Sequence, residues 1–361
     1  MRILINALHA RSGGGITYLN NMLPLLADDP ELDIHVCLHE NQRELLNTDT
    51  RKVTFHYLGF PYGFVRVLWR EQFDIPRLSR KIAADVVFSP ANFGPLLIRN
   101  GVIMLRNALG VGLVERRLGK IIYWIVLYKA TTASLIMCKR AITVSNYAKS
   151  QAGGFMAGPL SNRIRVIPHG KSDLFCPPPG GSEREDFLLS VSDIYVQKNM
   201  LNLIEALSMV REAHPNIKLK IAGRPVDQDY YQSLKALISR KRLEDNVEFL
   251  GEVPAEQLVP LYQQCRGFVF PSTVETFGNP LVEAMACGAP VACSGTAAMP
   301  EVTDDAALFF DPQNPSDIAA KLLTLINEDT SALSRKSIHR GNQFSWQKTK
   351  DQTVAVFKEI N

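Results

Sequence analysis

The sequence lacks the cysteine patterns that zinc-binding domains require. Its 361 residues include six cysteines. None of them forms a Cys-x-x-Cys pair or lies in a Cys/His cluster with zinc-finger spacing, so we expect no structural zinc. A secretory signal is also not apparent, because the first apolar run, Ile3–Ile5, is too short for the hydrophobic region of a signal peptide. These absences favour a protein of the reducing cytoplasm.

The sequence also has little that could cross a membrane or stay disordered. Its longest apolar stretch, residues 121–138, carries Lys129 near its middle. A charge at that depth is costly, and a spanning helix needs about 20 mostly apolar residues. We therefore predict that this stretch forms a buried helix of a soluble protein. Low-complexity tracts are missing, and 46% of the residues are hydrophobic, which is typical of globular domains.

Charge is divided unevenly along the chain. Residues 1–180 contain 22 Lys and Arg against 12 Asp and Glu, whereas residues 181–361 contain 18 against 24. The basic half could attract anionic lipids or phosphorylated substrates, although charge alone favours an ordinary solvated face. Within it, Arg116–Arg140 combines basic and aromatic residues. That composition fits a helix lying on an anionic membrane, and it also fits a buried helix with charged ends.

Short β-branched runs alternate with helical stretches, which is typical of a parallel, doubly wound α/β sheet. In the first half we expect a helix at Ile16–Leu26 and strands at Arg2–Ala7, Ile34–Leu38, Val53–Leu58, Val86–Ser89, Val102–Leu105 and Ala141–Ser145.

A proline- and glycine-rich tract near residues 168–185 separates this half from a second one with the same alternation. The second half predicts strands at Phe187–Val191, Leu219–Ala222, Val247–Leu250, Gly267–Phe270, Val291–Cys293 and Ala307–Phe309. It predicts helices at Asn199–Ala213, Asp229–Lys241, Ala255–Cys265, Pro280–Cys287 and Ser316–Ile326. We therefore predict two Rossmann-like domains, residues 1–168 and 169–342, with an interdomain cleft and a final helical segment at 343–361.

The segment 275–284, Glu-Thr-Phe-Gly-Asn-Pro-Leu-Val-Glu-Ala, is the strongest functional signal. Pro280 fits the first turn of a helix, and Gly278 lets the backbone approach a ligand. The start of a helix presents N–H groups and a positive dipole end to an anion such as a diphosphate. Glu283, about one turn into the helix, can then accept hydrogen bonds from ribose hydroxyls, and Glu275 from sugar hydroxyls. Two isolated glutamates would more often lie on an ordinary surface helix, but the Phe-Gly-x-Pro between them favours the binding site.

With its flanking residues, this segment resembles the donor-binding signature of the family-4 retaining glycosyltransferases, which have the GT-B fold. The match runs through Pro271-Ser272, Glu275, Phe277-Gly278, Pro280, Glu283–Ala286, Gly288, Pro290-Val291 and Pro300-Glu301. Other pieces similar to the family are Ser12–Gly15, Val144-Ser145, Val166–Gly170, Lys198-Asn199, Gly223, Gly251 and Phe344–Trp346.

The resemblance implies roles for individual residues. Lys198 would neutralise the departing diphosphate, and Lys198 and Glu275 would be the catalytic residues. The backbone around Phe277–Pro280, including Asn279, would meet the diphosphate and sugar. Gly14 and Gly15 would let a loop of the first domain approach the donor, and the final helix would cross back to that domain. A fixed lysine and a helix start can stabilise the leaving charge without a metal, so we expect neither a metal nor a cofactor.

The sequence departs from the family pattern at two places. Asp193 and Gln197 stand where relatives often carry a phosphate-binding Arg. Arg224, which follows Gly223, is a candidate replacement and fits an ordinary surface turn equally well.

The second departure lies in the first domain, where many relatives have a His-Asp pair after a middle strand. Arg106 and Asn107 occupy that place and are candidates for the acceptor side. His9, near the glycine loop, is another, although a lone histidine more often satisfies a local hydrogen bond.

Four other functions are weaker alternatives. A nicotinamide-dependent oxidoreductase would need a third small residue after Gly13-x-Gly15, where Tyr18 stands instead. An epimerase would need carboxylates and a histidine that we cannot identify, and a pyridoxal-dependent phosphorylase would be much longer. A binding-only relative is disfavoured by intact Lys198 and Glu275.

We therefore expect a retaining hexosyltransferase that moves a sugar from a nucleotide-diphosphate sugar to a glycan or lipid-linked acceptor in polysaccharide or lipopolysaccharide synthesis. We expect it to act in the cytoplasm, with possible peripheral membrane contact and without nucleic acid.

Overall fold

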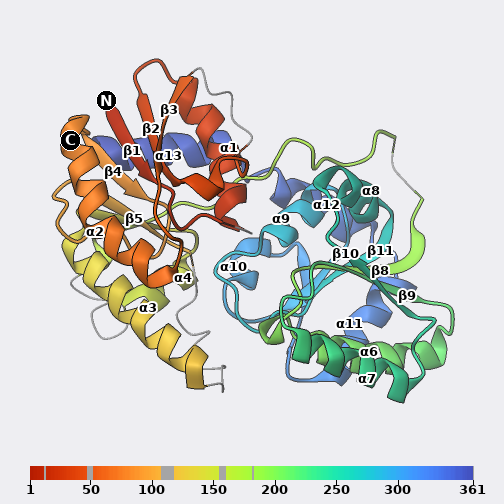
Figure 1. Ribbon diagram of the computed structural model, residues 1–361. Helices are drawn as coiled ribbons and strands as arrows, with labels where there is room; N and C mark the ends of the chain where they lie inside the picture. The colour runs from red at the N-terminus through yellow and green to blue at the C-terminus, as the bar shows by residue number, and fades with distance from the viewer. Residues whose placement is uncertain (12–13, 47–51, 107–117, 154–159, 181–182, 361) are drawn as a thin grey trace. The chain divides into compact units, whose positions relative to one another are not determined.

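The computed structural model describes residues 1–11, 14–46, 52–106, 118–153, 160–180 and 183–360. The chain divides into two compact units (Figure 1). Unit 1 consists of Met1–Gly170 together with Trp346–Asn361, and unit 2 of Lys171–Ser345. The sequence-based boundaries are 168 and 342.

Unit 1 contains a parallel seven-stranded sheet in the order β3-β2-β1-β4-β5-β6-β7. The strands are β1 Arg2–Asn6, β2 Asp33–His39, β3 Val53–Leu58, β4 Val86–Ser89, β5 Gly101–Leu105, β6 Arg140–Thr143 and β7 Ile164–Val166. The six predicted strands are confirmed, with ends that differ by one or two residues. β7 is missed because a three-residue strand at the edge of a sheet is too short to show a period-two pattern.

The helices of unit 1 are α1 Gly14–Ala27, α2 Phe64–Lys81, α3 Leu118–Met137, α4 Asn146–Gly153 and α13 Trp346–Lys358. α13 packs against α1 although it is the last helix of the chain, and in Figure 1 it lies in blue among the red and orange elements. Its Trp346 ring meets Tyr18 edge-on at 5.8 Å, and its Phe357 ring lies 5.2 Å from Phe88. Lys350 of α13 also forms an ion pair with Asp29, with Nζ 2.5 Å from Oδ2.

The predicted helix over residues 121–138 is present as part of α3, but the prediction that it is buried is wrong. Within the part of α3 whose side chains the structure describes, Ile125 is 50% exposed and Tyr128 is 45% exposed. The helix meets the sheet only along one stripe, which includes the buried Leu127 and Leu135. The helix carries apolar residues on more than one face, so its hydrophobic composition predicts more burial than the structure shows. Among the described residues, no helix is long and apolar enough to cross a membrane.

Unit 2 contains a parallel six-stranded sheet in the order β10-β9-β8-β11-β12-β13. The strands are β8 Glu185–Val191, β9 Lys218–Ala222, β10 Val247–Gly251, β11 Cys265–Phe270, β12 Val291–Ser294 and β13 Ala307–Phe310. The helices are α6 Met200–Ala213, α7 Gln228–Lys241, α8 Ala255–Gln264, α9 Asn279–Ala286, α10 Met299–Thr303, α11 Pro315–Asn327 and α12 Ser331–Gly341.

Helices cover both faces of this second sheet. α6, α7 and α11 lie together on one face, and α8, α9 and α12 lie on the other (Figure 1). Fully buried side chains such as Leu207, Leu322 and Met285 fill both layers. The doubly wound parallel architecture and the predicted elements of this half are therefore confirmed. α12 is missed because its sequence, Ser-Ala-Leu-Ser-Arg-Lys-Ser-Ile-His-Arg-Gly, has few apolar residues.

Each sheet reverses its strand order once. In unit 1 the reversal lies between β1 and β4, and in unit 2 it lies between β8 and β11. At such a switch point the two connections leave in opposite directions, which opens a crevice outside the carboxyl ends of the strands. These two places are where side chains from different loops can meet around a ligand.

Candidate functional site

The switch point of unit 2 brings Lys198 and Glu275 together. Lys198 lies in a short 3-10 turn, Val196–Lys198, after β8, and Glu275 lies in the loop after β11. Lys198 Nζ donates a short hydrogen bond to Glu275 Oε1, and the two side chains are 11% and 17% exposed. The two predicted catalytic residues are therefore in direct contact, although 77 positions separate them.

Backbone contacts hold the two loops at this distance. Thr273 donates from both N and Oγ1 to the carbonyl of Gln197, at 2.9 and 3.2 Å. Asn199, with a left-handed φ of 55°, donates from Nδ2 to the carbonyls of Pro271 and Pro312. The lysine and the carboxylate are thus mounted on loops that bond to each other.

The surroundings of Lys198 keep its ammonium group charged. Burial would lower the pKa of Lys198, but Glu275 and Tyr195 outweigh burial, so the pKa lies above its ordinary value. The ammonium also lies 5.4 Å from the ring centres of Tyr195 and Phe270. This is a fixed positive charge at the switch point.

The start of α9 has the form expected of an anion-binding helix. Its N-cap residue, Gly278, has φ of 88°, a left-handed conformation that favours glycine. Pro280 lies in the first turn, which contains no acidic residue, and the N-cap glycine has no side chain that could cap the helix. Phe277 is only 3% exposed and packs on Phe344, so its side chain belongs to the core and its backbone shapes the turn. Asn279 is the first helical residue.

Glu283 lies one turn into α9 and is held by a tyrosine that the sequence did not reveal. Tyr262 of α8, which is fully buried, donates a 3.0 Å hydrogen bond from its hydroxyl to Glu283 Oε2. Burial raises the pKa of Glu283 to about 7, while the tyrosine hydrogen bond acts in the opposite direction. Glu283 can therefore change its protonation state near neutral pH.

Arg224, the candidate replacement for the missing phosphate-binding arginine, pairs with Asp193, which stands at that arginine's position. Its Nη2 lies 3.2 Å from Asp193 Oδ2, and its Nε lies 3.8 Å from Glu252 Oε2. Gly223, just before it, has φ of 149° and packs so tightly that a Cβ there would lie 1.9 Å from the carbonyl oxygen of Ser192. The structure places Arg224 at the carboxyl end of β9 with its charge offset by carboxylates.

The switch point of unit 1 holds a second basic–acidic pair, His9 and Glu71. His9 Nε2 lies 2.6 Å from Glu71 Oε2, and Asn6 Nδ2 donates to Glu71 Oε1 at 2.9 Å and to Ser89 Oγ at 3.2 Å. Asn6 ends β1 and Ser89 ends β4, the two strands of the reversal. Glu71 is fully buried.

Glu71 was missed, although the sequence contains a signal for it. It occupies the buried face of α2 together with Val67 and Ile75, four residues away on either side. A carboxylate on the apolar face of an amphipathic helix is costly unless it is hydrogen-bonded. A glutamate at such a position therefore predicts hydrogen-bond partners from other parts of the fold.

Arg106 lies against the first turn of α1, at Gly15. A Cβ at Gly15 would lie 2.9 Å from Arg106 Nη1, whereas a Cβ at Gly14 would meet nothing within 4 Å. Burial lowers the pKa of Arg106 to about 10, with Tyr18 acting in the opposite direction. Asn107 lies outside the described residues. Tyr18 is buried against Phe88 and Trp346, so the glycine loop is not followed by the close helix–strand packing of a dinucleotide site.

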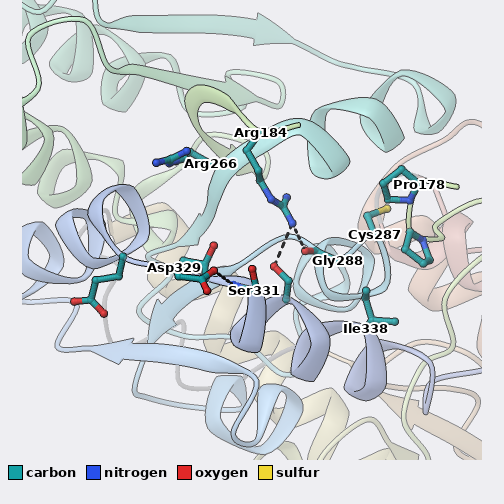
Figure 2. Close-up of a pocket in the computed structure, with 12 residues that line it drawn as sticks. Pro178, Arg184, Arg266, Cys287, Gly288, Asp329, Ser331 and Ile338 are labelled. Carbon is teal, nitrogen blue, oxygen red and sulfur yellow. Dashed lines mark hydrogen bonds between the residues drawn. The ribbon is translucent and has the colours of Figure 1, made fainter. Parts of the chain in front are cut away.

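A pocket of about 590 Å³ lies at the opposite, amino-terminal edge of the second sheet (Figure 2). Arg184, which precedes β8, donates from Nη2 to the Gly288 carbonyl at 2.6 Å and to Ser334 Oγ at 3.2 Å. Arg266 donates to the carbonyl of Ile326. Because these guanidinium groups bond to backbone carbonyls, they join the ends of the strands and helices rather than offering charge to a ligand.

One Asp-x-Asp occurs in the chain, at Asp227 and Asp229. Two such carboxylates could hold a divalent cation. Asp227 instead caps α7, where its side chain accepts a hydrogen bond from Tyr230 N. Within the described ranges, no group of three or more His, Cys, Asp or Glu side chains is placed to hold a metal ion.

Comparisons with known proteins agree with this architecture. The family model described as glycosyl transferases group 1 matches residues 177–343. The O-antigen chain mannosyltransferase B of Escherichia coli is 33% identical over 177 residues, which is 48% of this chain and 46% of that protein. An uncharacterized glycosyltransferase of Methanocaldococcus jannaschii is 23% identical over 99% of this chain and 85% of its own length. The matched region thus spans about half the length of the mannosyltransferase.

Solved structures resemble the whole chain. Sucrose-phosphate synthase from Thermosynechococcus elongatus has a TM-score of 0.80 at 17% identity, covering 99% of this chain and 98% of that one. HepE from Anabaena, in complex with UDP and glucose, has a TM-score of 0.78 at 19% identity, covering 99% of this chain and 100% of that one. At these identities the likeness shows the fold, which is the GT-B architecture of two Rossmann-like domains.

Proposed function

We propose that this chain transfers a hexose from a nucleotide-diphosphate sugar to a hydroxyl of an acceptor, because residues 177–343 match the family model described as glycosyl transferases group 1. The observation that carries the proposal is the contact between Lys198 and Glu275 at the switch point of unit 2. A buried ammonium that stays charged is suited to the negative charge that develops on a departing diphosphate. The mannosyltransferase relatives and the UDP and glucose bound to HepE support a nucleotide-sugar donor.

We assign the donor contacts to the loops around β8 and β11. The start of α9 would bind the diphosphate through its N–H groups, and Gly278 leaves room for that approach. Glu283 would accept hydrogen bonds from the ribose, and Glu275, which already orients Lys198, would bind hydroxyls of the transferred sugar. Arg224 would add a weaker attraction, because Asp193 offsets its charge.

We further propose that the transfer retains the anomeric configuration and uses no metal. The bond from the sugar carbon to the diphosphate would break as the acceptor oxygen bonds on the same face, and the acceptor proton would pass to the departing phosphate. The resemblance to retaining enzymes supports this mechanism. Lys198 and the helix start supply the positive charge that the step needs.

The acceptor is proposed to be a glycan or a lipid-linked glycan of the cell surface. The relatives include O-antigen mannosyltransferases, and WaaG, named for lipopolysaccharide biosynthesis, has a TM-score of 0.75. The outer face of α2 supports contact with an anionic membrane, because Val65, Trp69 and Phe73 are 75, 66 and 56% exposed there. Arg66 and Arg77 are exposed on the same helix. Such a face can bury its apolar side chains at a lipid surface.

Binding of nucleotides tests the donor assignment. We expect one of UDP, GDP or ADP to raise the melting temperature of the chain and to bind in calorimetry, and we expect Glu283→Ala to weaken that binding. Glu256→Ala, an exposed glutamate on α8, is the matched control and should not change it. Absence of binding by all three nucleotides would contradict the proposed function.

Co-sedimentation with vesicles tests the membrane contact separately. The protein should co-sediment with phosphatidylglycerol vesicles and should bind neutral phosphatidylcholine vesicles only weakly. The double variant Trp69→Ser with Phe73→Ser should reduce the fraction of protein that sediments with phosphatidylglycerol. Equal sedimentation of the parent and the double variant would remove α2 as the contact surface.

A further inference from the structure

A smaller pocket lies within unit 1, between α2 and α3 (Figure 1). Its volume is about 280 Å³, and its lining includes Val65 and Trp69 of α2, Leu96 of the loop between β4 and β5, and Ala130 of α3. We call it the α2–α3 pocket, and we propose that it binds one acyl chain of a membrane phospholipid. The proposal deepens the membrane contact of α2 proposed above and rests on it.

The polar side chains at this pocket, Gln72 and Ser134, bond to the loop between β4 and β5. Gln72 Oε1 accepts a 2.9 Å hydrogen bond from Leu96 N. Ser134 Oγ accepts from Gly94 N and donates to the Gly94 carbonyl, both at 3.2 Å. The surface that lines the pocket is almost entirely apolar. A sugar, a nucleotide or a peptide backbone would lose hydrogen bonds to water on entering, which is costly, whereas a hydrocarbon chain would lose none.

Small side chains on α3 make room for the chain. Ala130 and Ser134 lie one turn apart on the face that lines the pocket. Val126 and Met137 continue this face at helical spacing, and both are larger and exposed. If a methylene group fills roughly the 30 Å³ that a water molecule occupies in the liquid, the pocket holds about eight to ten carbons.

The surface beside the pocket suits an anionic lipid surface rather than a second copy of the chain. Val65 and Trp69 line the pocket and are also largely exposed, and Leu97 is 80% exposed on the adjoining loop. Arg66 and Lys129, each next to a lining residue in the sequence, are exposed as well. Apolar side chains beside cations match a bilayer of anionic phospholipids. Two copies of this face would bring like charges together, which disfavours a dimer.

Alkyl phosphates, used below their micelle concentrations, test the pocket without a membrane. Affinity in calorimetry should rise by about three- to fourfold for each methylene from hexyl through octyl to decyl phosphate. The rise should stop near about ten carbons, because the pocket is then full. A steady rise through dodecyl and tetradecyl phosphate, or no binding of any of them, would overturn the proposal. Tighter binding of farnesyl phosphate than of dodecyl phosphate would assign the pocket to an isoprenoid and overturn the acyl chain.

Trp69 gives an optical readout, because its side chain lines the pocket. Decanoate brominated at its terminal carbon should quench part of the tryptophan emission, and Trp69→Phe should abolish that part. Unbrominated decanoate is the control, and it should not quench. Quenching that persists in Trp69→Phe would place the chain elsewhere and contradict the proposal.

Ala130→Phe places a ring in the pocket and should lower the affinity for decyl phosphate by about tenfold or more, because most of the buried methylenes lose their place. Ile125→Phe adds a ring to the exposed side of the same helix and should leave the affinity unchanged. The urea midpoint of each variant reports whether it is folded. Ala130→Val, a milder change, should shorten the chain at which the affinity stops rising by about two carbons. Unchanged binding in both variants of Ala130 would refute the pocket.

The same samples separate this inference from the proposed function. Nucleotide binding should be equal in the parent protein and in Ala130→Phe, because Lys198, Glu283 and α9 belong to unit 2. Normal nucleotide binding and normal sedimentation with phosphatidylglycerol vesicles, without binding of alkyl phosphates, would refute only the α2–α3 pocket. Absence of nucleotide binding in the parent protein would refute the proposed function instead. A dimer in analytical ultracentrifugation that Trp69→Ser dissociates would assign this face to a second copy and overturn the proposal.

Discussion

The two sheets of this chain each bring a basic side chain and a carboxylate together where the strand order reverses. In unit 2 the pair is Lys198 and Glu275, and in unit 1 it is His9 and Glu71. The lysine is a permanent cation, because Glu275 and Tyr195 hold its pKa above its ordinary value.

The two pairs have different surroundings although the two sheets share one topology. The lysine lies at the same edge of the sheet as the start of α9. Both features place positive charge at that edge, which suits the binding of an anion. The histidine instead lies beside the fully buried carboxylate of Glu71 and the ring of Phe93. The strand order decides where the crevice opens, and the loop residues decide which ligand it takes.

The substitution with the largest expected effect tests whether the two units fold independently. Phe357 of α13 is fully buried against Phe88 in unit 1, so Phe357→Ala should destabilise that unit by about 3–5 kcal/mol. All three tryptophans, at positions 69, 124 and 346, belong to unit 1, so tryptophan fluorescence in a urea titration follows that unit alone. Nucleotide affinity at low denaturant should be unchanged.

The control for this variant is Phe73→Ala, because Phe73 is 56% exposed on α2. It should shift the fluorescence transition by less than about 0.5 kcal/mol. A loss of nucleotide binding in Phe357→Ala at low denaturant would show that the units do not fold separately, and the comparison between them would then fail.

Most of the fold could be predicted from the sequence because strand and helix periodicities are local. The alternation of strand and helix patterns over residues 187–326 predicted nearly every element of unit 2. Failures occurred where tertiary context decides. The short edge strand Ile164–Val166 lacks a pattern of its own, and α3 is apolar on faces that the sheet does not cover. Composition could not distinguish a helix that is buried from one that is only partly covered.

The second-largest effect tests the charged pair of unit 2. Lys198→Ala should reduce donor hydrolysis in the absence of acceptor by about 10²–10³-fold, because a buried, preorganised cation is removed from the leaving group. Lys235→Ala, an exposed lysine on α7, should leave the rate unchanged. Steady-state release of nucleotide from the bound sugar donor measures both. A rate within threefold of the parent would remove Lys198 from the mechanism.

A smaller effect follows from the pKa of Glu283, which burial raises to about 7. In the proposed donor site the ionised carboxylate would accept hydrogen bonds from ribose, so binding should favour the form that exists above that pKa. Nucleotide affinity should be full above pH 7 and should fall by about tenfold for each pH unit below it. Calorimetry between pH 5.5 and 8.5 measures this slope.

The nucleotide phosphate titrates in the same range, near pH 6, so the slope needs a matched variant. Glu283→Gln keeps the size of the side chain and cannot titrate. Its affinity should follow only the phosphate and should be flatter than that of the parent protein. Identical pH profiles for the two proteins would separate Glu283 from the nucleotide.

The candidate site could be predicted only where a motif is continuous in the sequence. Glu275 and Glu283 lie in one continuous segment, and the role of Lys198 was predicted from the resemblance to the glycosyltransferase family. Glu71 and Tyr262 reach their partners through tertiary packing, 62 and 21 positions away. Nothing in the local sequence of Tyr262 indicates its partner, whereas Glu71 could have been found from its place on the apolar face of α2.

The smallest expected effect concerns Arg224, the candidate replacement for a missing phosphate-binding arginine. Its side chain is 43% exposed, and its pair with Asp193 lies at the protein surface, where such pairs contribute about 0–1 kcal/mol. Arg224→Ala should therefore weaken nucleotide binding by less than about fivefold. Asp193→Ala should strengthen it by a similar factor, because the guanidinium is released toward the anion. If both single variants weaken binding equally and the double variant adds nothing, the pair acts only by shaping the loop after β8, and the positive charge of unit 2 then rests on Lys198 and α9.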